Sequence, residues 1–343
     1  MQALDPYSQG FPSQSYPSRI PARGTVLVTG GAGFIGSHLC ERLLDEGYRV
    51  LCLDNFCDSY DPGEKERNIS VALRRSGFNL VRGDILDVEL LGKLFCGRSK
   101  PDAVVHLAAL AGVLPSLNKA AAYVRVDVEG TVNLLEMAVR HGVKQFIFAS
   151  SSSVYGVRSE GPFREDDVAE GQVSPYAAAK RAGEIFCESY HRLWSLPVTV
   201  LRFFTVYGPR QRPDMAVRRF MERMTERLPV PLYGDGTSAR DYTYIEDCVD
   251  GIIAAIRRPL GFEIVNLGSS RMVQLNELVD TIAGEMGVVP HSERQPSQPG
   301  DVPLTWADIS TARRLLGWRP SVEIKEGVRR TVQWYREVAG RAR

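Results

Sequence analysis

The chain has 343 residues, of which 42 are lysine or arginine, 41 are aspartate or glutamate and 44% are hydrophobic. This balance gives no overall reason to expect nucleic acid or an anionic membrane as a partner, and the length suits two domains or one large α/β domain with a lobe. The six cysteines form no Cys-x-x-Cys pair and the five histidines no pair at metal-ligand spacing, which favours a cytoplasmic protein with reduced thiols and no metal site.

The first segment, residues 1–23, is rich in serine, proline, glutamine and tyrosine and has no apolar run. This composition predicts a disordered tail and not a signal peptide. No later stretch offers the roughly 18 uninterrupted apolar residues that a membrane span needs. We therefore expect a soluble protein without a membrane as partner.

A glycine-rich turn follows the first predicted strand. Residues 26–28 are an uncharged apolar run, as in strands buried on both faces of a parallel sheet, and Gly30, Gly33 and Gly36 come directly after it. A turn without Cβ atoms lets backbone N–H groups approach a pyrophosphate at the positive end of the next helix. The second strand ends at Asp54, whose carboxylate can accept both ribose hydroxyls of NAD and would repel the 2′-phosphate of NADP. This order of elements predicts NAD binding over a purely structural turn.

Strands and helices then alternate, which predicts a Rossmann-type doubly wound parallel sheet over residues 24–205, with its ligand at the carboxyl ends of the strands. Further strands are expected at 79–82, 103–107, 145–149 and 198–203, and helices near 34–46, 87–96, 117–141 and 176–194. Residues 206–343 predict a smaller, mainly helical C-terminal substrate lobe, with helices near 215–227, 246–258, 274–287, 308–316 and 325–339 and a short strand at 230–233. Residues 262–267 are a candidate for an extra strand of the main sheet.

Tyr176 and Lys180 form the only Tyr-x-x-x-Lys of the chain, at the start of a predicted helix. Four residues span slightly more than one turn, so the two side chains share a face about 6 Å apart along the axis. The ammonium favours a phenolate, and with it a general base. An isolated match would more often be a helix-start tyrosine and a solvated lysine, but after a nucleotide-binding fold we favour the catalytic interpretation.

A run of four serines, residues 150–153, ends the fifth predicted strand. It is either a polar strand exit or a group of neutral donors for a sugar or its carboxylate.

Over residues 24–338 the chain resembles the extended short-chain dehydrogenase/reductases that modify nucleotide sugars, and among them the UDP-glucuronate 4-epimerase branch. The general marks of the resemblance are the glycine turn, Asp54, Gly83-Asp-Ile85, His106-Leu-Ala-Ala109, Ser151, Tyr176 and Lys180. The marks of the branch are Asp58-Ser-Tyr-Asp-Pro62, Arg202-Phe-Phe-Thr-Val-Tyr-Gly-Pro209, Arg212-Pro-Asp-Met-Ala216, Tyr233-Gly-Asp-Gly236, Arg240-Asp-Tyr-Thr-Tyr-Ile245 and Gln298-Pro-Gly-Asp-Val-Pro303.

The resemblance implies the roles of the site residues. Tyr176 would take the proton of the sugar O4, Lys180 would support it and bind ribose, and Ser151 would bridge O4 to Tyr176. At the NAD cofactor it places Gly30, Gly33, Phe34, Ile35, Gly36, Asp54, Asn55, Asp84, Ile85, Leu107, Ala108, Ala109, Tyr176 and Lys180. At the UDP-sugar it places Ser151, Ser152, Ser153, Thr205, Arg212, Tyr233 beside uracil, Arg240 at the pyrophosphate and Asp301 at the ribose. It also implies a homodimer through the helices near 117–141 and 176–194.

Two positions depart from the family pattern: Leu114-Pro115 replace an expected arginine-aromatic pair, and Asp127 replaces an asparagine near the cofactor. Ser152 and Ser153 stand where 4,6-dehydratases resemble one another in having Asp-Glu and where decarboxylases have a glutamate. The resemblance thus implies 4-epimerisation of UDP-glucuronate to UDP-galacturonate through a transient 4-keto sugar. UDP-glucuronate decarboxylase, 4,6-dehydratase, a 4-epimerase of another UDP-hexose and a catalytically inactive NAD-binding protein remain the alternatives.

Overall fold

The main sheet has seven parallel strands in the order β10-β6-β5-β4-β1-β2-β3. The computed structural model describes residues 24–97 and 100–341, so the predicted disordered tail at 1–23 lies outside the described residues. The strands of this sheet are β1 Thr25–Thr29, β2 Arg49–Asp54, β3 Phe78–Arg82, β4 Ala103–His106, β5 Gln145–Ser151, β6 Val198–Phe203 and β10 Phe262–Leu267. The predicted doubly wound sheet is confirmed.

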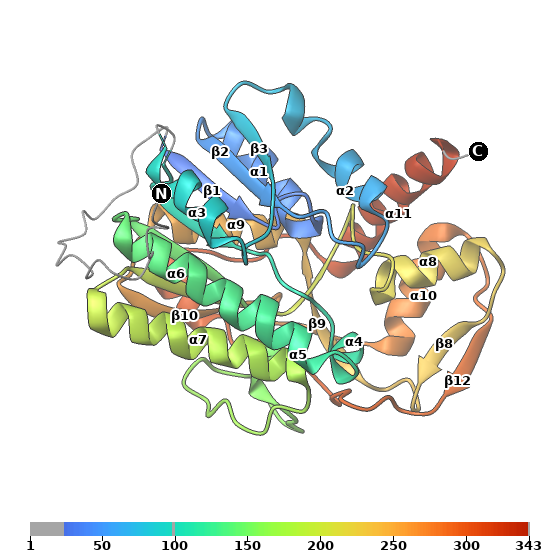
Figure 1. The fold of residues 1–343 in the computed structure, drawn as a ribbon. Coiled ribbons are helices and arrows are strands. Elements are labelled where there is room, and N and C mark those ends of the chain that lie inside the picture. The colour runs from blue at the N-terminus through green and yellow to red at the C-terminus, as the bar shows by residue number, and fades with distance from the viewer. Residues whose placement is uncertain (1–23, 98–99, 342–343) are drawn as a thin grey trace.

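Helices cover both faces of this sheet, as the uninterrupted burial of β1 and β5 requires. Val26 and Val28 belong to the core cluster on one side and Leu27 to the cluster on the other, in line with the alternation of side chains along a strand. Figure 1 shows α6 and α7 side by side on one face. The covering helices are α1 Phe34–Asp45, α3 Val88–Cys96, α6 Gly130–Arg140, α7 Pro175–Trp194 and α9 Ile245–Arg257.

Helix α7 carries the predicted Tyr-x-x-x-Lys pair, and its start is set by the local sequence. The side chain of Ser174 accepts a hydrogen bond from Ala177 N, and Pro175 occupies the first helical position, where its missing N–H is no loss. The helix ends at Ser195, which has the left-handed conformation. The capped start fixes where Tyr176 and Lys180 lie relative to the end of β5.

The helix predicted over 117–141 is wrong at its beginning. A short α4, Val113–Leu117, precedes Asn118 and Lys119, and the continuous helical segment begins with α5, Ala120–Tyr123. A π-helical turn, η2 Val124–Glu129, then joins α5 to α6. Lys119 has φ −135° and ψ 33°, outside the helical region, so one helix cannot run through it.

The part of the chain after β6 divides between the sheet and a smaller lobe. Helix α9 packs on α1, and β10 pairs with β6, so residues 245–267 lie with the main sheet. Figure 1 shows the lobe of α8, α10, β8 and β12 beside it. The remaining elements are α2 Pro62–Ile69, η1 Ala72–Arg74, η3 Ser152–Tyr155, β7 Thr205–Tyr207, α8 Ala216–Thr225, β8 Val230–Tyr233, β9 Ala239–Tyr244, β11 Met272–Gln274, α10 Leu275–Met286, β12 Ser292–Gln295, η4 Ala312–Leu316 and α11 Ile324–Arg341. In the portions that the structure describes, no helix combines the length and the apolar character needed to cross a membrane.

Candidate active site

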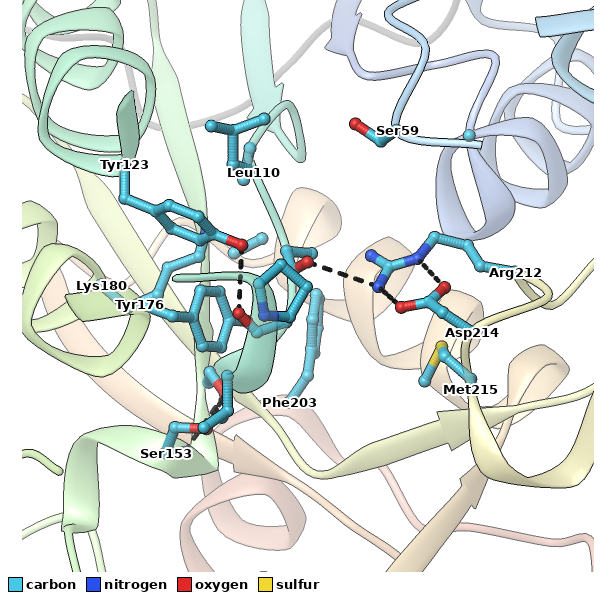
Figure 2. Close-up of a pocket in the computed structure, with 18 of the residues that line it drawn as sticks. Ser59, Leu110, Tyr123, Ser153, Tyr176, Lys180, Phe203, Arg212, Asp214 and Met215 are labelled. Atoms are coloured by element: carbon cyan, nitrogen blue, oxygen red, sulfur yellow. Dashed lines mark hydrogen bonds and ion pairs between the residues drawn. The ribbon is translucent and has the colours of Figure 1, made fainter. Parts of the chain in front are cut away.

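A cavity of about 820 Å³ opens where the carboxyl ends of the sheet strands face the smaller lobe. Every residue that the sequence predicts for the cofactor, the substrate or catalysis lines this one cavity. Strand order reverses between β1 and β4, so the cavity lies at the switch point of the sheet. Figure 2 shows Tyr176 of α7 on one side of this space and Arg212 on the other.

The glycine turn forms the wall of the cavity at the start of α1. Gly30 has φ +69° and donates its N–H to Leu53 O at 2.8 Å, and a Cβ on Gly36 would lie 2.2 Å from Gly30 O. Gly33 is the N-cap of α1 and makes no side-chain cap hydrogen bond. The first N–H groups of α1 therefore lack a side-chain cap, and with no Cβ in the way they suit a pyrophosphate.

Asp54 lies next to this turn, at the end of β2. Its Oδ2 accepts a hydrogen bond from Ala32 N at 3.0 Å and its Oδ1 one from Phe56 N at 2.8 Å, so the carboxylate is fixed by backbone groups. Both the acid and the glycine turn line the cavity, as a dinucleotide site requires. The described residues thus fit NAD: the N–H groups of α1 would hold its pyrophosphate and Asp54 one of its riboses.

The sequence did not predict Lys65, which is buried beside Asp54. Its Nζ lies 3.6 Å from Asp54 Oδ1 and 3.2 Å from Cys57 Sγ, and it faces the ring of Tyr60. Burial raises the pKa of the Cys57 thiol, but the hydrogen bonds from Ser59 and the nearby ammonium more than offset this effect and lower it. The only sequence signal was the place of the polar helix α2, directly after the strand that ends in Asp54.

Tyr176 and Lys180 lie on the cavity side of α7. Lys180 Nζ is 5.9 Å from the centre of the Tyr176 ring and 5.4 Å from that of Phe148, and its side chain is only 6% exposed. Tyr123 meets Tyr176 edge to face, with ring centres 6.2 Å apart, and donates its hydroxyl to Gly112 O at 3.0 Å. The ammonium is thus held in a low-dielectric site close to the phenol, where its field acts strongly.

The serine run ends β5 at the cavity. Ser151 Oγ donates to Ser153 Oγ at 3.1 Å and accepts from Ser153 N at 3.2 Å, and Ser152 begins the 3₁₀ helix η3. Thr205, the first residue of β7, lines the same cavity. Neutral hydroxyl groups therefore gather on this side of Tyr176.

A buried network of charged side chains is joined to the serine run through Ser150. Ser150 Oγ donates to Glu184 Oε1 at 2.6 Å, and Arg202 donates to both carboxylate oxygens of Glu184 at 2.9 Å. Arg181 adds a hydrogen bond to the same carboxylate at 3.0 Å. The network ties the ends of β5 and β6 to α7, so it holds Ser151 and Lys180 in a common frame.

The far end of the cavity is lined with cations that are already paired. Arg212 donates from Nε and Nη2 to Asp214 at 2.9 and 2.6 Å (Figure 2), and Arg240 forms an ion pair with Asp301. Tyr233 accepts a hydrogen bond from Arg219 at 3.3 Å. Asp214 and the neighbouring Met215 also line the cavity, and the sequence did not point to a role for either.

The two departures from the family pattern lie in or beside the site. Leu114 and Pro115 of α4 line the cavity, and Asp127 lies 4.0 Å from Lys180 Nζ.

His106 lies in the core and not at the site, where it forms hydrogen bonds with Thr29 and Thr131. In the stretches described, no group of three or more histidine, cysteine, aspartate or glutamate side chains could hold a metal ion.

A sequence model of the NAD dependent epimerase/dehydratase family matches residues 26–268. The chain belongs to this family. It is 42% identical over 315 residues to a UDP-glucuronate 4-epimerase of Thermodesulfobacterium geofontis, covering 92% of this chain and 97% of that protein. This confirms the predicted resemblance.

Solved structures are similar over nearly the same length. The UDP-glucuronic acid 4-epimerase of Bacillus cereus, in complex with UDP-glucuronic acid and NAD, is 38% identical with a TM-score of 0.86, over 92% of this chain and 99% of that one. The UDP-glucose 4-epimerase of Thermotoga maritima, with UDP-glucose, is 33% identical with a TM-score of 0.84, over 92% of this chain and 99% of that one. Both are sugar-nucleotide epimerases, so the fold and the general reaction type agree.

Proposed function

We propose that the chain is an NAD-dependent UDP-glucuronate 4-epimerase that interconverts UDP-glucuronate and UDP-galacturonate. The observation that carries this proposal is a single cavity that combines the glycine turn, the Tyr176 and Lys180 pair and the hydroxyl groups of residues 151–153 and Thr205. The relatives named UDP-glucuronate 4-epimerase support the choice of substrate. NAD, when bound, accepts the C4 hydride and returns it to the opposite face of the keto sugar.

In this proposal Tyr176 is the general base that removes the proton from the sugar O4 and later gives it back. Lys180 favours the phenolate and binds a ribose, and Ser151 holds O4 in reach of the phenol. At the cofactor, Asp54 accepts the hydroxyls of the adenosine ribose, and the N–H groups of α1 hold the pyrophosphate. Asn55, Asp84 and the other predicted cofactor residues complete this part of the site.

The two ends of the substrate are held differently. Arg240 and Arg212 would bind the UDP end through charge, Tyr233 through its ring, and Asp301 through hydrogen bonds to the ribose. The sugar meets the Tyr176 phenol and small hydroxyl groups, and no charged side chain is assigned to hold it. A loosely held sugar can turn about its pyrophosphate and present its other face to the cofactor. This asymmetry is what a 4-epimerase needs, because the hydride must return from the opposite side of the ring.

The serines favour an epimerase over a lyase on the same scaffold. A 4-keto uronate is a β-keto acid and loses CO₂ readily unless its carboxylate is restrained. Ser152 and Ser153 cannot act as acid or base near neutral pH, but together with Thr205 they can hydrogen-bond the carboxylate. We propose that they hold it away from the orientation that favours cleavage of the C–C bond.

We also propose a cytoplasmic homodimer. The surface of the α5 to α7 region exposes large apolar side chains, which suit burial against a second copy. These side chains and their exposures are Val124 at 58%, Ile185 at 53%, Phe186 at 38% and Leu193 at 66%. All six cysteines lie in the described part of the chain as free thiols, which suits a reducing compartment.

The test of the proposed base is Tyr176→Phe with Tyr123→Phe as its matched control. Both phenols line the cavity and their rings touch, but only Tyr176 shares a helix face with Lys180. We expect Tyr176→Phe to retain NAD and lose about 10²–10⁴-fold in turnover, while Tyr123→Phe keeps most activity. Turnover of Tyr176→Phe close to that of the wild type would exclude Tyr176 as the base.

A further inference from the structure

Asp127 is a buried carboxylate that the reaction outlined above does not use. Its side chain has no exposed surface, and it sits in the π-helical turn η2. Oδ1 accepts a hydrogen bond from Leu110 N at 2.7 Å, whereas Oδ2 has no hydrogen-bond partner among the residues that the structure describes. The nearest cation is Lys180, with Nζ 4.0 Å from Oδ2. A buried carboxylate oxygen without a hydrogen bond is costly, so its position calls for a role.

The fold holds Asp127 in this place from two sides. The backbone oxygen of Asp127 accepts from Thr131 Oγ1 at 2.6 Å, and that hydroxyl also bonds His106 Nε2 at 3.0 Å. On the other side, the hydrogen bond from Leu110 N fixes Oδ1. The carboxylate therefore cannot turn outward to water, and its distance from Lys180 is set by the packing of η2 against α7.

We propose that Asp127 is a positioning residue whose carboxylate partly balances the ammonium charge of Lys180 and so sets how strongly that ammonium favours the Tyr176 phenolate. The proposal rests on the proposed function, in which Tyr176 is the base. An ionised carboxylate 4.0 Å from Nζ opposes the field that the ammonium exerts on the phenol. When Asp127 takes up a proton, the full charge of the ammonium acts on Tyr176.

The titratable groups around Asp127 are Lys180 and Tyr176 of α7, Tyr123 of α5 and His106 of β4. Burial raises the pKa of Asp127 to about 6, although the charge of Lys180 and a backbone hydrogen bond lower it. Burial and Lys180 lower the pKa of His106 to about 3, and burial raises the pKa of Tyr123 to about 12, so both are neutral near pH 6. Among Asp127, His106 and Tyr123, Asp127 is the group whose charge changes close to pH 6.

The experiment compares Asp127→Asn with Glu129→Gln, which removes the same charge from an exposed position on the same turn. Two quantities are followed against pH: turnover with UDP-glucuronate, and tyrosinate absorbance of the NAD-loaded enzyme without substrate. Tyr176→Phe in each background isolates the signal of Tyr176. We expect Asp127→Asn to move the acid limb of turnover and the tyrosinate signal down by about one pH unit, and Glu129→Gln to move neither.

Unchanged positions of both signals in a folded, NAD-binding Asp127→Asn variant would overturn the proposal. If that variant does not fold, Asp127→Ser keeps an acceptor for Leu110 N without the charge. The absorbance does not depend on turnover, so failure of the proposed function would be seen separately, as activity retained in Tyr176→Phe.

Discussion

Replacement of Glu184 by alanine should be among the most damaging single changes to stability in this fold. The side chains of Glu184 and Arg202 are 0% and 2% exposed, and two hydrogen bonds of 2.9 Å join them. Glu184→Ala leaves the Arg202 guanidinium buried without its counterion and Ser150 without its acceptor. Loss of one partner from a buried pair costs about 3–5 kcal/mol of the free energy of unfolding. The measurement is the denaturant midpoint of unfolding by fluorescence and circular dichroism.

The control is Glu188→Ala, one turn further along α7. Glu188 pairs with Arg192 at 2.6 Å, but the two side chains are 39% and 74% exposed. A surface pair of this kind contributes about 0–1 kcal/mol, so this variant should unfold close to the wild type. Equal losses in the two variants would show that burial of the pair does not set its contribution to stability. A double variant, Glu184→Leu with Arg202→Met, should recover most of the loss, because no unpaired charge remains in the core.

Four further predictions concern the site and the assembly. Gly36→Ala, whose Cβ would lie 2.2 Å from Gly30 O, should weaken NAD binding by about ten- to a hundredfold in calorimetry, whereas Gly92→Ala, with open space at its Cβ, should not. Thr205→Ala should raise KM for UDP-glucuronate by about tenfold or increase the share of UDP-pentose in chromatography. If the KM and the share of UDP-pentose both stay unchanged, Thr205 does not contact the carboxylate. Phe186→Glu should yield a monomer in light scattering, and a monomeric wild type at micromolar concentration would contradict the dimer. The pKa of Asp127 rises from 3.8 to about 6 on folding, so the folded state binds its proton more tightly, and this stabilisation is lost as the pH rises from 4 to 6. Asp127→Asn cannot ionise, so in thermal unfolding it should be as stable as the wild type below pH 4 and more stable by on the order of 2–3 kcal/mol above pH 6.

The parts of the fold that depend on local sequence could be predicted. Strand β1, the glycine turn, α1 and the acid at the end of β2 follow one another within 30 residues, and each is specified by its own periodicity or turn residues. The same holds for the start of α7, where Ser174 and Pro175 define the cap. The topology then brings these short segments to one edge of the sheet, and this is why residues predicted separately line one cavity.

Features that depend on partners distant in the sequence could not be predicted. Lys65 belongs to a polar helix and looks like a surface residue, yet it is buried because Asp54 of another element lies beside it. The sequence likewise does not show that Glu184 and Arg202 form a buried ion pair, because the pair depends on the packing of β6 beside α7. The π-helical turn around Asp127 depends on contacts with the loop after β4, and the periodicity of residues 117–141 did not indicate it.

The proposed epimerase activity is tested by incubation of the wild-type enzyme and NAD with UDP-glucuronate, followed by chromatographic separation and NMR identification of the products. A UDP-glucuronate 4-epimerase should give the same mixture of UDP-glucuronate and UDP-galacturonate from either sugar, with little pentose released. UDP-pentose and CO₂ as the main products would contradict the epimerase assignment and show a UDP-glucuronate decarboxylase instead. If no UDP-hexose or UDP-uronate is converted, the protein binds NAD without catalysis.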